Sequence, residues 1–135
     1  MIKGIDHVAV AVENIDEALD IFAKVLGLEA EHREVIASYG VEVATIRLGN
    51  TAIELVCGTT PDSPISKYIA RRGPGIHHIA LETDDIQAEL ARVKENGADL
   101  IDVTPRDGKE QSRVAFIHPR STGRILYELV QNRKR

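Results

Sequence analysis

The stretch IDHVAVAVENIDEAL at residues 5–19 returns as HHIALETDDIQAEL at residues 77–90. The aligned histidines, His7 and His78, stand 71 positions apart, and an isoleucine follows each of them by eight positions. Each half then closes on a similar tetrapeptide, IELV or YELV, whose glutamate follows the histidine by 47 positions at Glu54 and by 50 at Glu128. Motifs that return in the same order at nearly equal spacing indicate internal duplication.

Each copy predicts a strand, a helix and three further strands. Alternating apolar residues over 3–12 favour the first strand. Asn14 is a candidate helix N-cap with Glu17 three positions on, and Gly27 is a suitable stop for the helix. The later strands of this half are expected near 29–36, 41–48 and 51–57, with a turn at Gly49-Asn50. The second half predicts a helix near 85–96, stopped by Gly97, and strands near 99–104, 112–118 and 124–131.

Proline and glycine residues between the halves predict a linker near 58–75, with a short helix that begins at Ser63 and Pro64. The sequence thus predicts one α+β domain over residues 1–135, with modules near 1–57 and 76–135. We expect two tandem βαβββ modules that pair into a curved, partly closed eight-stranded mixed sheet with helices outside.

Composition narrows the class of protein. The apolar fraction of 43% and the charged fraction of 28% are those of an ordinary globular domain. A net charge of −4 argues against nucleic-acid binding, and no apolar run is long enough for a membrane span. The single cysteine, Cys57, rules out an internal disulfide and, with a strand pattern directly at the N-terminus, favours a cytoplasmic protein.

Strand alternation places four polar residues on the face of their strand opposite to their immediate large apolar neighbours. His7 shares its face with Ala9 and Ala11, while the alternate valines should pack on the helix, and the second copy behaves alike. Small residues beside a histidine, with large ones opposite, predict a concave cleft left open for a ligand. A glutamate between large apolar neighbours is costly unless its charge has a partner. If the modules pair about a pseudo-twofold axis, His7, Glu54, His78 and Glu128 converge as nitrogen and oxygen ligands for a divalent first-row metal. The alternative is that the histidines are ordinary core residues and the glutamates form ion pairs.

Longer stretches resemble the vicinal oxygen chelate superfamily and, within it, the methylmalonyl-CoA epimerases. These stretches are IDHVAVAV, LGNTAIELV, PDSPISKYI, GIHHIALETDDI and FIHPRSTG leading into YELV. The resemblance implies that His7, Glu54, His78 and Glu128 bind a divalent metal, with Co2+ favoured and Mn2+, Ni2+ or Zn2+ as alternatives. It also implies interconversion of (R)- and (S)-methylmalonyl-CoA through an enolate chelated to that metal.

Three carboxylates are candidates for the base that removes the substrate proton. Glu128 is the first candidate, and Glu54 would serve on the opposite face of the substrate. Some relatives carry a catalytic glutamate three positions after a glycine, where this chain has Val43, so Glu42 is a third candidate. Strand register would turn Glu42 away from the cleft unless a bulge intervenes. Candidates for binding the substrate carboxylate are Ser121, Thr122, Arg120 and Arg113.

Other activities of the same fold stay open at this point. A lactoylglutathione lyase of the glyoxalase I type uses the same ligand types, and an extradiol dioxygenase uses two histidines and one glutamate. With an aromatic fraction of 4%, the chain offers little for stacking a catechol ring. A metal-free protein that binds a small molecule such as an antibiotic is the third alternative. The expected partners are an acyl-CoA substrate and a second copy of the chain in a homodimer.

Overall fold

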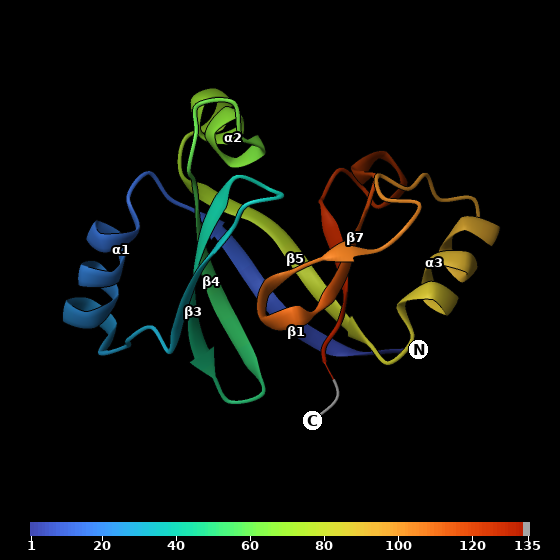
Figure 1. The fold of residues 1–135 in the computed structure, drawn as a ribbon, viewed down its shortest axis with the longest axis horizontal. Helices are drawn as coiled ribbons and strands as arrows, with labels where there is room; N and C mark the ends of the chain where they lie inside the picture. The colour runs from blue at the N-terminus through green and yellow to red at the C-terminus, as the bar shows by residue number, and fades with distance from the viewer. Residues whose placement is uncertain (134–135) are drawn as a thin grey trace. The chain divides into compact units, whose positions relative to one another are not determined.

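The computed structural model describes residues 1–133. Its strands and helices follow the repeated order predicted from the sequence (Figure 1). The first half contains β1 (Ile2–Ala11), α1 (Ile15–Ile21), the π-helix η1 (Phe22–Leu26), β2 (His32–Ile36), β3 (Val41–Leu48), β4 (Thr51–Gly58) and α2 (Pro64–Arg72). The second half contains β5 (Gly75–Thr83), α3 (Ile86–Glu95), β6 (Arg106–Asp107), the 3-10 helix η2 (Lys109–Gln111), β7 (Arg113–Ile117), the 3-10 helix η3 (Pro119–Ser121) and β8 (Tyr127–Gln131).

The chain forms two compact units, and strand β1 contributes to both. One unit spans Val8–His77, and the other combines Met1–His7 with the chain from His78 onward. The hydrogen-bonded strands form one mixed eight-stranded sheet in the order β2-β3-β4-β1-β5-β8-β7-β6. The β1–β4 and β5–β8 pairs are parallel, and the β2–β3, β3–β4, β6–β7 and β7–β8 pairs are antiparallel. The predicted α+β class with tandem βαβββ modules is confirmed.

The strand registers repeat the duplication seen in the sequence. Ala9 of β1 lies opposite Glu54 of β4, and Ala80 of β5 lies opposite Glu128 of β8. Each alanine follows the aligned histidine by two positions and therefore shares its face of the strand. Glu54 consequently points to the same side of the sheet as Ala9, and Glu128 points to the same side as Ala80 and His78.

In the unit of residues 8–77, the two sheet faces pack on different helices. Ile15 of α1 joins a buried apolar cluster with Leu55, and Val10 and Val12 pack against that cluster, as predicted. On the other face, α2 packs against Ala9 and Ala11 through its residues Ile65 and Ile69. The expectation that this stretch of β1 is left open is wrong, because α2 covers these two alanines completely.

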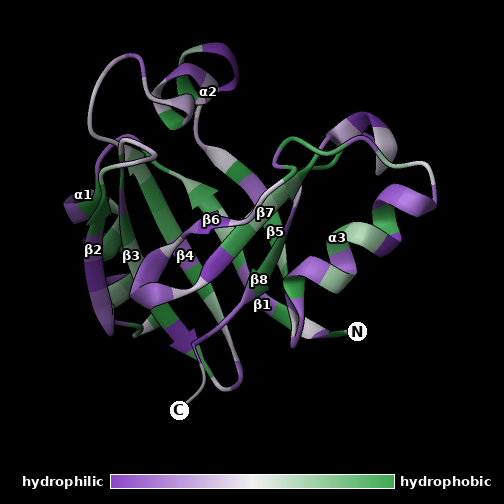
Figure 2. Cartoon of the chain, turned by 45° about the vertical axis from the view of Figure 1, so that its right-hand side comes forward, coloured by the Kyte–Doolittle hydropathy of each residue, from purple (hydrophilic) through white to green (hydrophobic). Residues whose placement is uncertain are grey.

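In the second unit, α3 covers one face of its strands. The buried apolar cluster there contains Ile86, Leu90, Ala115, Ile117 and Leu129. Figure 2 shows apolar and polar residues in turn along α3, as an amphipathic surface helix requires. The Gln131 side-chain oxygen at the end of β8 accepts a hydrogen bond of 2.9 Å from the main-chain N–H of Ile86, which fastens the start of α3 to the sheet.

The helix boundaries follow the predicted caps. The Asn14 side chain accepts from the N–H of Glu17 at 2.9 Å, and Ser63 caps α2 in the same way. Gly27 ends the first helical segment at a φ of 67°, a conformation that glycine adopts without strain. The sequence did not reveal that the last turns before Gly27 are a π-helix. Among residues 1–133, none of the helices is long and apolar enough to span a membrane.

The strand predicted at 99–104 is wrong. Strand β6 lies later and has two residues. The reason is Asp102, whose carboxylate accepts the N–H of Phe116 at 2.8 Å and so replaces a main-chain partner on β7. The N–H groups of Ile101 and Asp102 both turn to the carbonyl of Phe116. Strand β8 also begins three residues later than predicted, because Arg124 has a φ of 72° that an extended strand excludes.

Candidate metal centre

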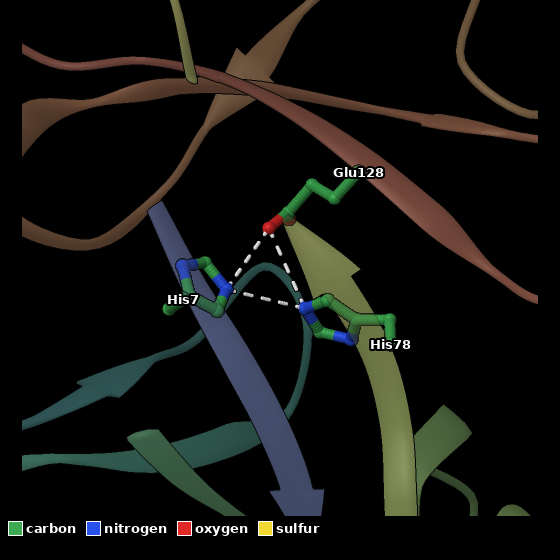
Figure 3. A group of neighbouring side chains, drawn as sticks. All are labelled: His7, His78 and Glu128. Carbon is green, nitrogen blue, oxygen red and sulfur yellow. Dashed lines mark hydrogen bonds and ion pairs between the residues drawn. The ribbon is translucent and has the colours of Figure 1, made fainter. Parts of the chain in front are cut away.

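Three of the four predicted ligands meet in the second unit. His7 of β1, His78 of β5 and Glu128 of β8 point toward one another (Figure 3). The Nε2 atoms of the two histidines are 3.3 Å apart, and Glu128 Oε1 lies 3.2 Å from Nε2 of His7 and 3.4 Å from Nε2 of His78. The exposed fractions of the three residues are 5%, 7% and 6%. Three ligand atoms thus form a nearly equilateral triangle away from bulk water.

Packing around the triangle fixes the side chains. Ala80, small and fully buried, lies opposite Glu128 in the parallel ladder and leaves room for the longer side chains. Phe116 lies opposite Glu128 on β7, and its ring meets the ring of His78 edge to face, with centroids 5.1 Å apart and planes at 90°. The aromatic contact limits rotation of the His78 imidazole about its Cβ–Cγ bond.

Glu128 is an ionised carboxylate in a buried place. Burial raises the pKa of the Glu128 carboxyl, but the electrostatic interaction of the carboxylate with the neighbouring His78 and His7 outweighs this, and the pKa falls from 4.5 to about 2. Within residues 1–133, the Oε1 atom accepts no hydrogen bond of good geometry although both imidazole nitrogens lie near it. A buried anionic oxygen held close to two nitrogens in this way is suited to share a cation with them.

The size of the triangle fits a first-row metal ion. An ion about 2.1 Å from each of two ligand atoms holds them about 3.0 Å apart at a right angle and about 3.4 Å apart at the tetrahedral angle. The three observed separations, 3.2, 3.3 and 3.4 Å, lie between these limits. Two imidazoles and a carboxylate are also the donors that such ions accept. The residues therefore fit the metal that the resemblance implies.

A second carboxylate, that of Asp6, lies next to the Nδ1 side of the His7 ring. Asp6 Oδ2 lies 2.7 Å from Nδ1 of His7, and Asp6 Oδ1 accepts a hydrogen bond of 2.8 Å from Asn132. Burial raises the pKa of Asp6, but the hydrogen bonds from His7 and Asn132 lower it below its usual range overall. Sequence reasoning missed Asp6 and Asn132. The available signal was that Asp6 directly precedes a predicted ligand, whereas the second copy has His77 at that position.

Glu54, the fourth predicted ligand, belongs to the unit of residues 8–77. It lies on β4 beside Ala9 and opposite Thr45 of β3, and it is buried. Its place on the same strand face as the small alanine agrees with the alternation read from the sequence. Its participation in a metal site stays a prediction, which a variant of Glu54 can test.

Glu42 has a partner on the surface. Its carboxylate accepts two hydrogen bonds from Arg33, at 2.8 and 3.2 Å, and its neighbour across the ladder is Cys57. The β3–β4 ladder pairs every residue from Val41 to Leu48 without a bulge, so Glu42 lies on the sheet face opposite to Glu54. This geometry does not favour Glu42 as a base. Val43 is buried in the apolar cluster beside α2 and offers no acid–base group.

The four candidate substrate-binding side chains all make local bonds. Ser121 Oγ accepts from the N–H of Asp99 at 2.8 Å, and Arg120 donates to the Asp99 carboxylate at 2.7 Å. The Arg120 guanidinium holds the pKa of Asp99 below its usual range. Thr122 and Arg113 each donate to a main-chain carbonyl, both at 2.9 Å. These bonds order the loops around β7 and β8, and a part in substrate binding stays a prediction.

Comparison with known proteins identifies the family of the chain. The sequence matches the Glyoxalase/Bleomycin resistance protein/Dioxygenase superfamily over residues 6–116. It is 36% identical over 133 residues to the ethylmalonyl-CoA/methylmalonyl-CoA epimerase of Cereibacter sphaeroides, covering 97% of this chain and 99% of that protein.

Solved structures give the same result at the level of the backbone. Methylmalonyl-CoA epimerase from Mycobacterium tuberculosis superposes with a TM-score of 0.94 at 32% identity, covering 98% of this chain and 90% of that one. A methylmalonyl-CoA epimerase in complex with methylmalonyl-CoA and NH4+ superposes with a TM-score of 0.94 at 31% identity, covering 98% and 96%. The resemblance predicted from the repeated motifs is confirmed, and the chain belongs to the glyoxalase/bleomycin resistance protein/dioxygenase superfamily.

Proposed function

We propose that this protein is a metal-dependent isomerase that interconverts the (R) and (S) epimers of methylmalonyl-CoA. The observation that carries the proposal is the convergence of His7, His78 and Glu128 at 3.2–3.4 Å. It occurs in a chain whose relatives include epimerases of this substrate. A protein that only sequesters a small molecule has no need of such a buried set of ligands.

The chemistry requires a site of this kind. Epimerisation removes a proton from the carbon between a thioester and a carboxylate, a carbon acid far weaker than any side chain. A divalent metal held by His7, His78 and Glu128 would supply Lewis-acid stabilisation of the negative charge that develops on the substrate oxygens, worth several kcal/mol. The chain supplies buried walls around the ligands, which exclude water and strengthen electrostatic interactions.

Two carboxylates remain as candidates for the proton-abstracting base, Glu128 and Glu54. The low pKa of Glu128 suits a metal ligand better than a base, because a base works best when its pKa lies near the working pH. Val43 offers no acid–base group where some relatives have a glutamate, so Glu54 is the candidate for the second face of the substrate. A positioned base contributes about 10²- to 10⁴-fold to the rate.

The test of the proposed function follows a single epimer of methylmalonyl-CoA in D2O by NMR. Protein loaded with Co2+ is expected to scramble the stereocentre and to exchange the α-proton for deuterium, and chelator-treated protein is expected to do neither. Absence of exchange with each of Co2+, Mn2+, Ni2+ and Zn2+ would contradict the proposal. Formation of S-lactoylglutathione from methylglyoxal and glutathione would assign the glyoxalase I alternative instead.

Glutamine variants separate the two carboxylates. Glu128→Gln that abolishes exchange while retaining metal would make Glu128 the base, whereas loss of both would make it a ligand. Glu54→Gln is expected to slow exchange, and an unchanged rate would remove Glu54 from the reaction. Glu95→Gln, an exposed change of the same chemistry on α3, is the matched control. The expected homodimer stays a prediction that sedimentation equilibrium would measure.

A further inference from the structure

We infer that Asp6 is a positioning residue that keeps the proton of His7 on Nδ1, so that the Nε2 lone pair faces Glu128 and His78. The inference rests on the metal site of the proposed function and adds a residue to it. The first supporting observation is that Asp6 Oδ2 lies 2.7 Å from His7 Nδ1. The Asp6 side chain is largely buried, with 12% of its surface exposed.

The tautomer follows from the donor and acceptor capacity of the two groups. A neutral imidazole carries one N–H, on either nitrogen, and an ionised carboxylate can only accept. A hydrogen bond between Asp6 and Nδ1 of His7 therefore requires the proton on Nδ1. Nε2 is then left with the lone pair that a metal ligand needs. The same bond fixes the plane of the ring, and a carboxylate behind a ligand histidine also increases its basicity.

Asp6 is itself held in place from the strand that carries Glu128. Asn132, the residue after β8, donates from Nδ2 to Asp6 Oδ1 at 2.8 Å, and Nδ2 also lies 2.8 Å from Glu82 Oε2 on β5. Asn132 is four positions beyond Glu128 in the chain. One amide thus ties the carboxylate behind His7 to two neighbouring strands, which limits the positions that Asp6 can take.

The duplication shows that this arrangement is specific to one half. The position equivalent to Asp6 in the second copy is His77. The ring of His77 packs edge to face on Tyr68, with centroids 4.8 Å apart, so His77 does not take the role that Asp6 has. The imidazole of His78 is instead braced by Phe116, at 5.1 Å between ring centroids. The repeated strand therefore does not require an aspartate before the ligand histidine. We attribute the presence of Asp6 to its hydrogen bond with His7.

Two measurements test the role of Asp6. Nitrogen-15 NMR of the metal-free protein, recorded at a pH at which the imidazole of His7 is neutral, reads its tautomer directly. The wild type is expected to hold the proton on Nδ1, and Asp6→Ala is expected to show a mixture with Nε2–H. Competition with a chromogenic chelator reads Co2+ affinity, which Asp6→Ala should weaken about 10- to 100-fold. Asp6→Asn, whose amide oxygen still accepts a hydrogen bond but carries no charge, should fall between the two.

The controls separate positioning from folding. Asp20→Ala is the matched change at an exposed aspartate and should leave tautomer and affinity as in the wild type. Asn132→Ala, which leaves Asp6 intact but loosens it, should weaken affinity less than Asp6→Ala and serves if that variant fails to fold. Unchanged tautomer and unchanged affinity in the folded variants overturn the inference. A tautomer change in a protein that binds no Co2+ would uphold the role of Asp6 and contradict the proposed function.

Discussion

Replacing Glu128 with glutamine tests the metal centre through the stability of the fold. The change removes the carboxylate from the triangle of His7, His78 and Glu128 and keeps the size of the side chain. A metal that binds the folded chain alone stabilises it by RT ln(1 + [M]/Kd), about 2.7 kcal/mol when the free metal is 100 times Kd. We therefore expect the wild type to gain stability from Co2+ and Glu128→Gln to lose most of that gain.

The size of the expected loss in Co2+ affinity follows from the ligand set. Glu128 is one of three ligands and is the only charged ligand of the three. Loss of such a ligand should weaken binding at least about 100-fold, which leaves a stabilisation of about 0.4 kcal/mol at the same metal concentration. For a chain of 135 residues, 1 kcal/mol changes the midpoint of thermal unfolding by about 3–4 °C. The expected shift is thus about 8–11 °C for the wild type and about 1–2 °C for the variant.

The assay is thermal unfolding with and without Co2+, followed by far-ultraviolet circular dichroism because the chain has no tryptophan. Glu95→Gln, an exposed substitution of the same kind, should reproduce the wild-type shift. A Glu128→Gln protein that gains as many degrees from Co2+ as the wild type would refute the assignment of Glu128 as a ligand.

Three further outcomes are expected. The metal-free protein should lose stability as the pH falls from 4.5 toward 2, because the pKa of Glu128 lies near 2 in the folded state and its stabilising effect is complete only above 4.5. Urea unfolding at several pH values measures this loss, which Glu128→Gln should reduce. Phe116→Leu should weaken Co2+ binding several-fold by freeing the ring of His78, at a cost of about 1–2 kcal/mol of stability. Asp85→Ala removes the cap that accepts from the N–H of Ala88 and should cost about 1 kcal/mol in urea unfolding while leaving Co2+ affinity unchanged.

Each of these expectations has a contrary result. Acid unfolding that Glu128→Gln leaves unaltered would show that the lowered pKa contributes no stability. Wild-type Co2+ affinity in Phe116→Leu would remove the aromatic contact from the account of the site. A loss of Co2+ affinity in Asp85→Ala would show that α3 is coupled to the metal ligands, which its position on the opposite face of the sheet does not predict.

The duplication made much of the fold predictable. His7, His78 and Glu128 could be placed on one side of their strands because alternation and the repeat spacing act locally and leave their mark in the residue pattern. The caps Asn14 and Ser63 were equally readable, since a short polar side chain at a helix start has a local hydrogen-bonding role.

The sequence did not predict where a side chain takes the place of a main-chain hydrogen-bond partner. Asp102 takes the N–H of Phe116 and ends a strand that hydrophobic alternation extends through 99–104. The burial of Ala9 and Ala11 depends on where α2 packs, which local pattern does not specify. Asp6 was missed because its partner Asn132 lies 126 positions away, and only the folded strands bring the two together.

Metal content and epimerase rate, measured on the same samples, test the central claim most directly. Chelator-treated protein is titrated with Co2+, and bound metal and the rate of α-proton exchange are recorded at each step. We predict that the rate rises in proportion to bound metal and stops rising at one ion per chain. Full activity in the metal-free protein, or one bound ion per chain without any exchange, would contradict it.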